Sequence, residues 1–510
     1  MKLNQNLLAD IFQNGMIFPL NKDFKLGGYI QPNQAVEVEF AGKRYLTKSS
    51  NNGKWCVIIP AVSDPTYVGE IAVHASKHIQ IIKNIKFGHV YLLSGQSNIE
   101  YRLKDEAHYK NVISDLKNKK YSDFYYYNVP QVDYIDHENG DIKPKNLQAE
   151  SWHEINENNV GMISAVGFYM MAALRENDVY GPLAVVDCFK GGTSASVWIK
   201  EDDLASDPRL KRAFLDKYHE IIDGKTWSDF DRETAAYNLR VEKHNQDLAK
   251  YLKMHPDTSL STAKNIVGHT PWPPPYRPDL YTRPSGLNET MLKQVEFGVF
   301  NQMVWYQGEN DTDRANYYYL LLPRLLHTWR RTLKDPSLPI KLIQLPGYAD
   351  YPDNSGAVIR QTQMMVAQQF SQVDLVSFID GGEEHNIHPT NKKDMGMRLG
   401  RIMAGNDYSG TPYVSKVRIK DQKLTLEIAR CSQLVLKENV FLKIKYLDDS
   451  FETVRLTNKN IRKNEIVLDL KKTFLGVSYA YKNYPTHIGL YNELGYPVSP
   501  FKYEYKKKMF

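Results

Sequence analysis

Cysteine is scarce in this chain: its 510 residues contain only Cys56, Cys188 and Cys431. Three thiols far apart in the sequence predict neither a disulfide framework nor a CxxC metal site, so we expect free, buried cysteines. No apolar run approaches the length of about 18 residues that a membrane-spanning helix needs. Asp10 and Asn14 interrupt the N-terminal segment, which therefore lacks the apolar core of a signal peptide. We expect a cytoplasmic protein that does not associate with a membrane.

An excess of one charge is also missing. The chain has 65 Lys and Arg against 59 Asp and Glu, a net charge of +6 that is slight for this length. Because a nucleic-acid-binding protein usually carries a denser basic stripe, we expect no nucleic-acid partner. Apolar residues make up 42% of the chain, which excludes a disordered protein. The length predicts about three domains.

The patterning divides the chain into three regions. Residues 1–87 form a predicted β-sandwich-like domain, in which Ala35–Phe40 alternates apolar and polar side chains. Residues 88–405 alternate helical patterns, such as Met162–Arg175 and Arg360–Phe370, with short apolar runs. These runs are His89–Leu93, Leu183–Asp187, Val299–Tyr306, Ile340–Leu345 and Leu375–Asp380. Such a region is typical of an α/β domain with a doubly wound parallel sheet. Residues 406–510 predict a C-terminal β-domain.

One segment interrupts the α/β alternation. Residues 200–275 are charged and helix-prone, and Pro271 and Pro273 to Pro275 end the helical pattern. This segment is a helical insertion or lid at the edge of the α/β domain, or else a solvated spacer.

Polar residues follow several apolar runs, at the sheet edge where an open α/β domain binds its ligand. Ser97 lies two residues after Gly95, where a tight turn would expose its hydroxyl as a nucleophile; alternatively it is only a helix N-cap. Gly191 and Gly192 could offer bare N–H groups to an oxyanion. His388 lies in a loop and is a candidate base.

The loop after Tyr306 carries further candidates. Gln307 or Asn310 could donate to an oxyanion, and Glu309 could orient a base. A zinc site of His385, His388, Glu383 and Glu384 is the alternative. Its H-x-x-H spacing lacks a helix and a third ligand at a recognised spacing, so we expect no metal.

Several motifs, in order along the chain, resemble the sialate O-acetylesterase-like family of SGNH (GDSL-type) hydrolases, which includes acetylxylan-esterase-like members. The matching blocks are Gly95–Asn98, Gly191–Thr193 with Trp198, Arg283–Leu287, Trp305–Glu309, and Ile387–Lys392 with Gly396, Arg398 and Leu399. The resemblance implies an SGNH-hydrolase domain flanked by N- and C-terminal β-domains.

The resemblance also implies a carbohydrate O-acetylesterase. Ser97 would attack the acetyl carbonyl and His388 would act as general base and acid. The N–H groups of Ser97 and Gly192, with a side chain from Gln307 or Asn310, would hold the oxyanion. No cofactor is implied, and the partner is an O-acetylated sugar. Sialic acid is the expected sugar; acetylated xylan or other oligosaccharides, or a non-catalytic carbohydrate-binding role, are the alternatives.

The acid that orients His388 is open, because His385 stands where many SGNH enzymes have an aspartate, three residues before the histidine. Asp380 and Glu309 are the candidates, and a Ser–His dyad held by a backbone carbonyl is the third alternative. We favour Asp380, and therefore expect Asp380→Asn to be more damaging than Glu309→Gln.

Overall fold

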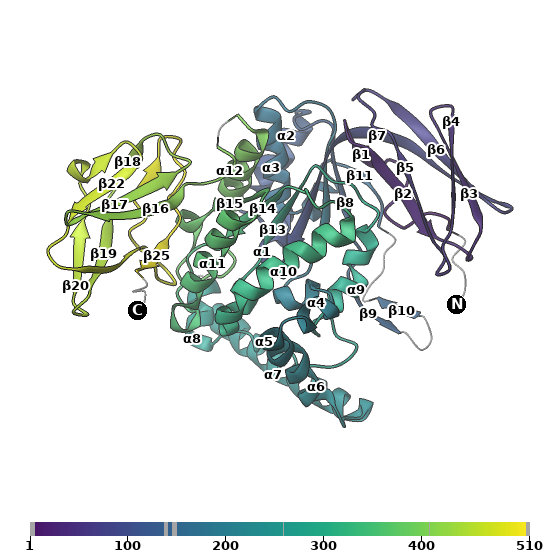
Figure 1. Cartoon of the computed structure of the whole chain (residues 1–510). Helices are drawn as coiled ribbons and strands as arrows, with labels where there is room; N and C mark the ends of the chain where they lie inside the picture. The colour runs from purple at the N-terminus through teal and green to yellow at the C-terminus, as the bar shows by residue number, and fades with distance from the viewer. Residues whose placement is uncertain (1–5, 137–140, 145–149, 259, 407, 506–510) are drawn as a thin grey trace.

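A computed structural model describes residues 6–136, 141–144, 150–258, 260–406 and 408–505 of the chain. Figure 1 shows a central α/β domain between an N-terminal and a C-terminal β-domain, as the sequence predicted. The three thiols are free; Cys188 and Cys431 are buried, and Cys56 is half-buried. Among the described residues, the helices are all too short or too polar to span a membrane.

The central sheet has the strand order β11-β8-β12-β7-β13-β14-β15. All neighbouring pairs are parallel except β11 and β8 at one edge. The strands are β7 (His78–Gly95), β8 (Phe124–Asn128), β11 (His153–Glu154), β12 (Leu183–Phe189), β13 (Gln302–Tyr306), β14 (Ile340–Gln344) and β15 (Val373–Ser377). The five predicted apolar runs correspond to β7, β12, β13, β14 and β15, which confirms the doubly wound sheet. The sequence analysis missed β8, a buried strand made mainly of tyrosine.

Helices cover both faces of this sheet. Leu93 and Val304 share one face, where a Cβ added to Gly167 of α3 (Ala165–Glu176) would lie 2.5 Å from Leu93 Cδ1. On the other face, Trp305 packs against Trp198, which in turn contacts Trp329. Trp329 belongs to α10 (Ala315–Leu333), which packs with α11 (Ser355–Gln369). The predicted helices correspond to α3 and α11. Two covered faces explain why these strands are apolar throughout.

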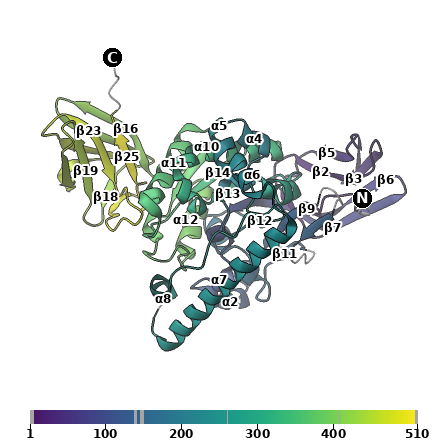
Figure 2. The same cartoon turned by 90° about the horizontal axis from the view of Figure 1, so that it is seen from below.

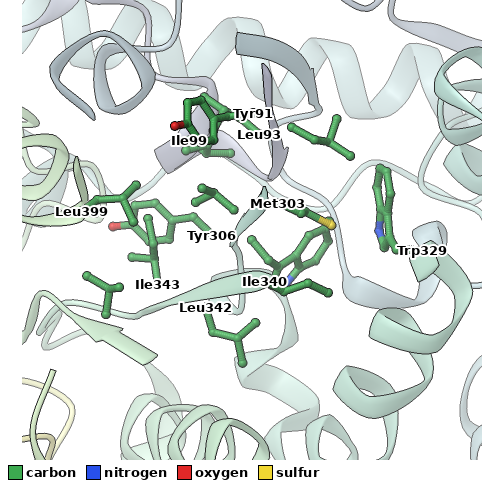
Figure 3. Close-up of a cluster of buried hydrophobic side chains, with 14 of the residues drawn as sticks. Tyr91, Leu93, Ile99, Met303, Tyr306, Trp329, Ile340, Leu342, Ile343 and Leu399 are labelled. Carbon is green, nitrogen blue, oxygen red and sulfur yellow. The ribbon is translucent and has the colours of Figure 1, made fainter. Parts of the chain in front are cut away.

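The core of the domain lies between the sheet and these helices. Figure 3 shows Tyr91, Leu93, Met303, Tyr306, Ile340, Leu342 and Ile343 of the strands together with Ile99, Trp329 and Leu399. Each of these side chains is almost fully buried. Burying one large apolar side chain stabilises a fold by about 1.5–3 kcal/mol, so this cluster makes the sheet a rigid platform for the loops at its edge.

Helix α12 (Lys393–Ala404) packs unusually closely on α3. A Cβ on Gly396 would lie 2.5 Å from Tyr169 Cβ, and one on Gly400 would lie 2.3 Å from the Met170 carbonyl oxygen. Glycine at both positions lets the two helix backbones approach. Because α12 directly follows the loop that carries His388, this contact anchors that loop.

The N-terminal domain shares a strand with the central domain. Residues 78–86 of β7 pair with β6, whereas residues 89–95 pair with β12 and β13. The predicted boundary at residues 87 and 88 therefore falls inside one continuous strand. The other strands are β1 (Ile17–Pro19), β2 (Phe24–Tyr29), β3 (Ala35–Phe40), β4 (Lys43–Lys48), β5 (Lys54–Ile59) and β6 (Val68–Ala75).

The C-terminal domain contains two antiparallel sheets, with orders β16-β17-β22-β21 and β20-β19-β23-β25, and a short β18-β24 pair. Its alternating buried and exposed positions follow the apolar–polar pattern of the sequence. The strands are β16 (Tyr413–Lys420), β17 (Lys423–Ala429), β18 (Leu434–Leu436), β19 (Phe441–Tyr446), β20 (Phe451–Arg455), β21 (Ile461–Arg462), β22 (Glu465–Asp469), β23 (Phe474–Tyr479), β24 (Leu490–Asn492) and β25 (Phe501–Glu504).

The segment 200–275 is helical. Its longest helix, α7 (Trp227–Met254), begins with a capping box between Thr226 and Asp229 and is prominent in Figure 2. The other α-helices here are α4 (Glu201–Ala205), α5 (Pro208–Leu210), α6 (Lys217–Ile222) and α8 (Leu260–Val267), and a π-helical turn at Lys211–Asp216 joins α5 to α6. Outside the segment lie α1 (Ser97–Glu100), α2 (Tyr109–Lys117), α9 (Gly286–Thr290) and a hairpin of β9 (Val132–Asp136) and β10 (Asp141–Pro144).

Candidate active site

The loops after β7, β12 and β13 lie together because these strands are neighbours in the sheet. β7 ends at Gly95, whose φ of +139° is rarely adopted by residues with a side chain. A Cβ there would lie 2.0 Å from the carbonyl oxygen of Tyr306. Glycine thus permits the sharp turn into α1, whose first residue is Ser97. In the sheet, β8 and β12 lie on one side of β7, and β13, β14 and β15 lie on the other. The turn after β7 is therefore at the point where the strand order reverses, which is the usual position of a ligand site.

The structure brings Ser97 and His388 together. The Ser97 hydroxyl oxygen lies 2.7 Å from Nε2 of His388, across 291 residues of sequence. Desolvation of the imidazole, together with the smaller effects of the charges of Lys392 and Lys264, lowers the pKa of His388 to about 4. The ring is therefore neutral at neutral pH, and Nε2 can accept the serine proton.

Hydrogen bonds within the loop hold the backbone of His388. Its N–H donates to Asn386 Oδ1 at 3.1 Å, and Asn386 Nδ2 donates to Glu383 Oε2 at 2.9 Å. The other oxygen of Glu383 accepts from the Thr390 N–H at 2.9 Å. Glu383 and Asn386 thus brace the two sides of the histidine, and the sequence analysis did not assign them this role.

In the part of the chain that the structure describes, the distal nitrogen of His388 is not contacted by an acid. Both oxygens of Asp380 accept from Arg398, at 2.8 Å each, and Glu309 accepts from Asn98. Within the described part of the chain, neither a carboxylate nor a backbone carbonyl lies within hydrogen-bond distance of Nδ1, and no carboxylate contributes to the pKa shift of His388. The structure therefore does not bring Asp380, favoured from the sequence, to the imidazole. Among the described residues, Ser97 and His388 thus form a pair without an orienting acid.

Asn98 links the serine loop to the histidine loop. This buried side chain donates to Glu309 Oε1 at 2.5 Å and to the Ile387 carbonyl at 2.9 Å, and it accepts from Lys392 Nζ at 2.6 Å. Burial raises the pKa of Glu309 and lowers that of Lys392 to about 7. The network holds the two loops at a set separation. Asn98 and Lys392 belong to the motif blocks Gly95–Asn98 and Ile387–Lys392, and this was the sequence signal that could have identified them as site residues.

Two backbone N–H groups are available beside Ser97. The Ser97 N–H belongs to the first residue of α1, and the Gly191–Gly192 turn lies close, since a Cβ on Gly191 would be 3.6 Å from Ser97 Cβ. The Gly191 N–H donates to the Glu100 carboxylate. Among the described residues, the N–H groups of Ser97 and Gly192 have no protein acceptor. Both are therefore free to donate to an oxyanion.

Asn310 and Gln307, the two amide side chains considered as oxyanion donors, lie in different environments. The Asn310 N–H donates to Gln96 Oε1 at 3.2 Å, and Asn310 Oδ1 accepts from the indole N–H of Trp272 at 2.9 Å. Because its oxygen is occupied, Nδ2 of Asn310 is left to donate. Asn310 is half-buried, as a group facing a substrate would be.

Gln307 is fully buried and holds loops together instead. Its Nε2 donates to the Thr193 carbonyl at 3.0 Å and to Asp311 Oδ2 at 2.7 Å, which uses both amide hydrogens. Asp311 also accepts from the Ser194 hydroxyl at 2.5 Å. Gln307 and Asp311 therefore fix the loop that carries Gly192. Gln307 Nε2 therefore has no amide hydrogen left to donate to an oxyanion.

The two histidines of the alternative zinc site have different partners. His385 Nδ1 lies 3.1 Å from Asp350 Oδ1, whereas His388 faces Ser97. Across the described ranges, no group of three or more His, Cys, Asp or Glu side chains is arranged to hold a metal ion.

Comparison with known proteins places this site in a family context. A family model described as carbohydrate esterase, sialic acid-specific acetylesterase, matches residues 277–406, which include Asn310 and His388. A sialate O-acetylesterase from Mus musculus is 24% identical over 280 residues, which are 52% of this chain and 44% of that protein. The chain thus spans less than half the length of this curated relative.

A solved structure shows the same fold. A carbohydrate acetylesterase from Xanthomonas citri superposes with a TM-score of 0.71 at 20% identity, covering 98% of this chain and 99% of that one. Together these matches confirm the resemblance to the sialate O-acetylesterase-like family that the motifs predicted.

Proposed function

We propose that this chain, which resembles the sialate O-acetylesterase-like carbohydrate esterases, removes acetyl groups from O-acetylated sugars by a serine mechanism. The observation that carries the proposal is the 2.7 Å contact between Ser97 Oγ and His388 Nε2 beside two unpaired N–H groups. A nucleophile within hydrogen-bond reach of a neutral base is the arrangement that acyl transfer requires. The same arrangement disfavours a role as a non-catalytic carbohydrate-binding protein.

In the first half of the reaction, Ser97 Oγ attacks the acetyl carbonyl carbon while His388 Nε2 takes the hydroxyl proton. The carbonyl oxygen becomes an oxyanion, which the N–H groups of Ser97 and Gly192 and Nδ2 of Asn310 stabilise. Removing one such donor typically costs about 2.7–4 kcal/mol of barrier lowering. The tetrahedral species collapses, the sugar oxygen leaves, and Nε2–H protonates it. The enzyme now carries an acetyl group on Ser97.

In the second half, a water molecule attacks the acetyl-enzyme. His388 Nε2 takes one proton from that water, the same donors hold the second oxyanion, and the Ser97 oxygen leaves with the proton from Nε2. Acetic acid is released and both residues return to their starting state. The proton moves only between the serine, the histidine, the sugar and water, so the cycle needs no carboxylate as a proton carrier.

Replacing Asp380 is expected to affect stability more than catalysis. Asp380→Asn breaks a largely buried ion pair with Arg398 and should destabilise the fold by about 3 kcal/mol, whereas kcat should not show the ~10⁴-fold loss expected for an orienting acid. Glu309→Gln should lower kcat more, because Glu309 contacts Asn98 beside the nucleophile. This order is the reverse of that expected from sequence. Thermal unfolding and kcat of both variants test it.

Asp374→Asn is the matched control, since Asp374 forms an ion pair with Lys341 at 2.7 Å near the start of β15, the strand that precedes Asp380. It should destabilise the fold without changing kcat. A severe kcat loss in Asp380→Asn but not in Asp374→Asn would return the orienting role to Asp380.

Within this proposal we favour an acidic sugar, and O-acetylated sialic acid in particular. The matching family model and the mouse relative are both described by sialic acid. In this chain, the charge of half-buried Lys264, on α8 of the insertion, lowers the pKa of His388. Lys264 makes no ion pair within the described ranges. A cation that acts on the catalytic histidine is suited to a substrate carboxylate, which a neutral xylan-type sugar lacks.

Lys264→Gln is therefore expected to raise KM for O-acetylated sialic acid about tenfold, a loss of about 1.4 kcal/mol of binding. KM for acetylated xylobiose should stay within about twofold, because it has no carboxylate. Removing the cation should also raise the pKa of His388, which shifts the acidic limb of the pH profile to higher pH. Acetate release from both sugars over a range of pH measures all three quantities.

The same assay separates the alternatives. If Lys264→Gln changed KM equally for both sugars, Lys264 would not recognise the substrate carboxylate. Faster turnover of acetylated xylobiose than of O-acetylated sialic acid by the unchanged protein would favour the acetylated-oligosaccharide alternative.

A further inference from the structure

Trp272 extends from the end of the helical insertion to the proposed oxyanion site. Its indole N–H donates to Asn310 Oδ1 at 2.9 Å. The carbonyl of the preceding residue, Pro271, accepts from the Tyr237 hydroxyl of α7 at 2.9 Å, which ties this part of the chain to the long helix of the insertion. The insertion therefore contacts the catalytic loops through this tryptophan.

The indole ring also packs against Gly192. A Cβ on Gly192 would lie 2.4 Å from Trp272 Cζ2, 2.7 Å from Cη2 and 3.2 Å from Cε2. These atoms and Nε1 lie along one edge of the indole. Gly192 has a φ of +67°, so both its backbone conformation and the ring above it require glycine. Through this edge the ring contacts two of the three proposed oxyanion donors, Gly192 and Asn310.

The rest of the ring is open to solvent. Trp272 is 47% exposed, whereas Trp198, Trp305 and Trp329 of the central domain are fully buried. A large, half-exposed aromatic side chain that is held by a specific hydrogen bond offers a rigid apolar surface. Gly191, which precedes Gly192 in the chain, lies close to Ser97. The exposed surface of Trp272 therefore borders the proposed site of acyl transfer.

We propose that Trp272 is a substrate-binding residue, on whose exposed ring the sugar of the acetyl ester packs. This inference rests on the proposed function and goes beyond it, because Trp272 lies outside residues 277–406, the part of the chain that the esterase family model matches. Its N–H also positions Asn310, so that one residue of the insertion serves both the sugar and the oxyanion.

The chemistry of a sugar ring fits this surface. A pyranose presents C–H groups on its faces, and these carry partial positive charge, whereas the face of an indole is electronegative. The sugar hydroxyls at the rim remain in water, so packing buries apolar surface without burying unpaired polar groups. A small alkyl acetate has no ring to place there. Trp272 should therefore contribute to binding of a sugar ester and not of a simple ester.

Kinetics of Trp272→Ala and Trp272→Phe on an acetylated sugar and on ethyl acetate test the proposal. The sugar is O-acetylated sialic acid or acetylated xylobiose, whichever the unchanged protein hydrolyses faster. Trp272→Ala should raise KM for the sugar about tenfold and leave KM for ethyl acetate within about twofold. Trp272→Phe keeps a ring and should nearly retain the sugar KM. Both variants should lower kcat on both substrates, because Asn310 loses the N–H that orients it.

Trp227→Ala is the matched control: Trp227 is 53% exposed and belongs to the same insertion, at the start of α7. It should change neither parameter. An unchanged sugar KM in Trp272→Ala, or an equal rise for ethyl acetate, would overturn the proposal.

A binding measurement separates this inference from the proposed function. If the unchanged protein releases no acetate, the proposed function fails, and Trp272 is tested by calorimetric titration of Ser97→Ala protein with sialic acid and with xylobiose. Binding that is lost on adding Trp272→Ala, but kept on adding Trp227→Ala, supports the sugar-binding role. Equal binding in the two double variants overturns it.

Discussion

Ser97→Ala is expected to lower kcat for acetate release by about 10⁶-fold, the loss typical of removing the nucleophile from a serine hydrolase. Among the described residues the hydroxyl oxygen has one side-chain partner, His388 Nε2 at 2.7 Å, so its removal leaves no other polar group there unpaired. Alanine also has high helix propensity and suits the first position of α1. The fold should therefore be retained, and circular dichroism and thermal unfolding should match those of the unchanged protein.

Ser94→Ala provides the control for this variant. Ser94 lies three residues earlier, in β7, is fully buried, and its hydroxyl has no hydrogen-bond partner among the described residues. It should keep nearly full activity on an aryl acetate. If Ser97→Ala protein retains more than a few per cent of activity, Ser97 is not the nucleophile and the serine mechanism is wrong.

His388→Ala is expected to cost as much as Ser97→Ala, because a serine without its base is a poor nucleophile. Residues that act as a unit are strongly non-additive, so the double variant should be no slower than either single variant. The residual rate then comes from binding and from the oxyanion donors. Single-turnover measurements on the three variants provide the comparison.

The histidine prediction has its control on the same loop. His385 contacts Asp350 rather than Ser97, so His385→Ala should change kcat little. Additive losses in the double variant would mean that Ser97 and His388 act in separate steps, which would contradict the pair mechanism. A severe loss in His385→Ala alone would place the base at that position.

Strand-end residues could be predicted from the sequence because parallel strands bring their carboxyl ends to one edge of a sheet. Ser97 follows β7 and Asn310 follows β13, and the two strands are neighbours in the structure. The position of the site therefore followed from recognising buried apolar runs. Strand order was not needed for that step, since any order leaves these ends at the same edge.

The roles of side chains that depend on contacts between loops could not be predicted from the sequence in the same way. Gln307 and Asn310 carry the same amide group after the same strand, yet Gln307 is fully buried between loops and Asn310 is half-buried beside Trp272. Asp380 lies only eight residues before His388, but its carboxylate accepts hydrogen bonds from Arg398 instead. Arg398 belongs to α12, whose position is set by its packing on α3. A short separation in sequence did not imply contact.

The sequence by itself determined the α/β class, the β-domains on either side, and the loops after strands that carry Ser97 and His388. These features depend on periodicity and on turns, which neighbouring residues specify. Only the tertiary structure decided that β7 runs through the predicted domain boundary, that Asn98 joins the loops of Ser97 and His388, and that Trp272 packs against Gly192. Such contacts join residues far apart in the chain, and they depend on how whole helices and strands pack.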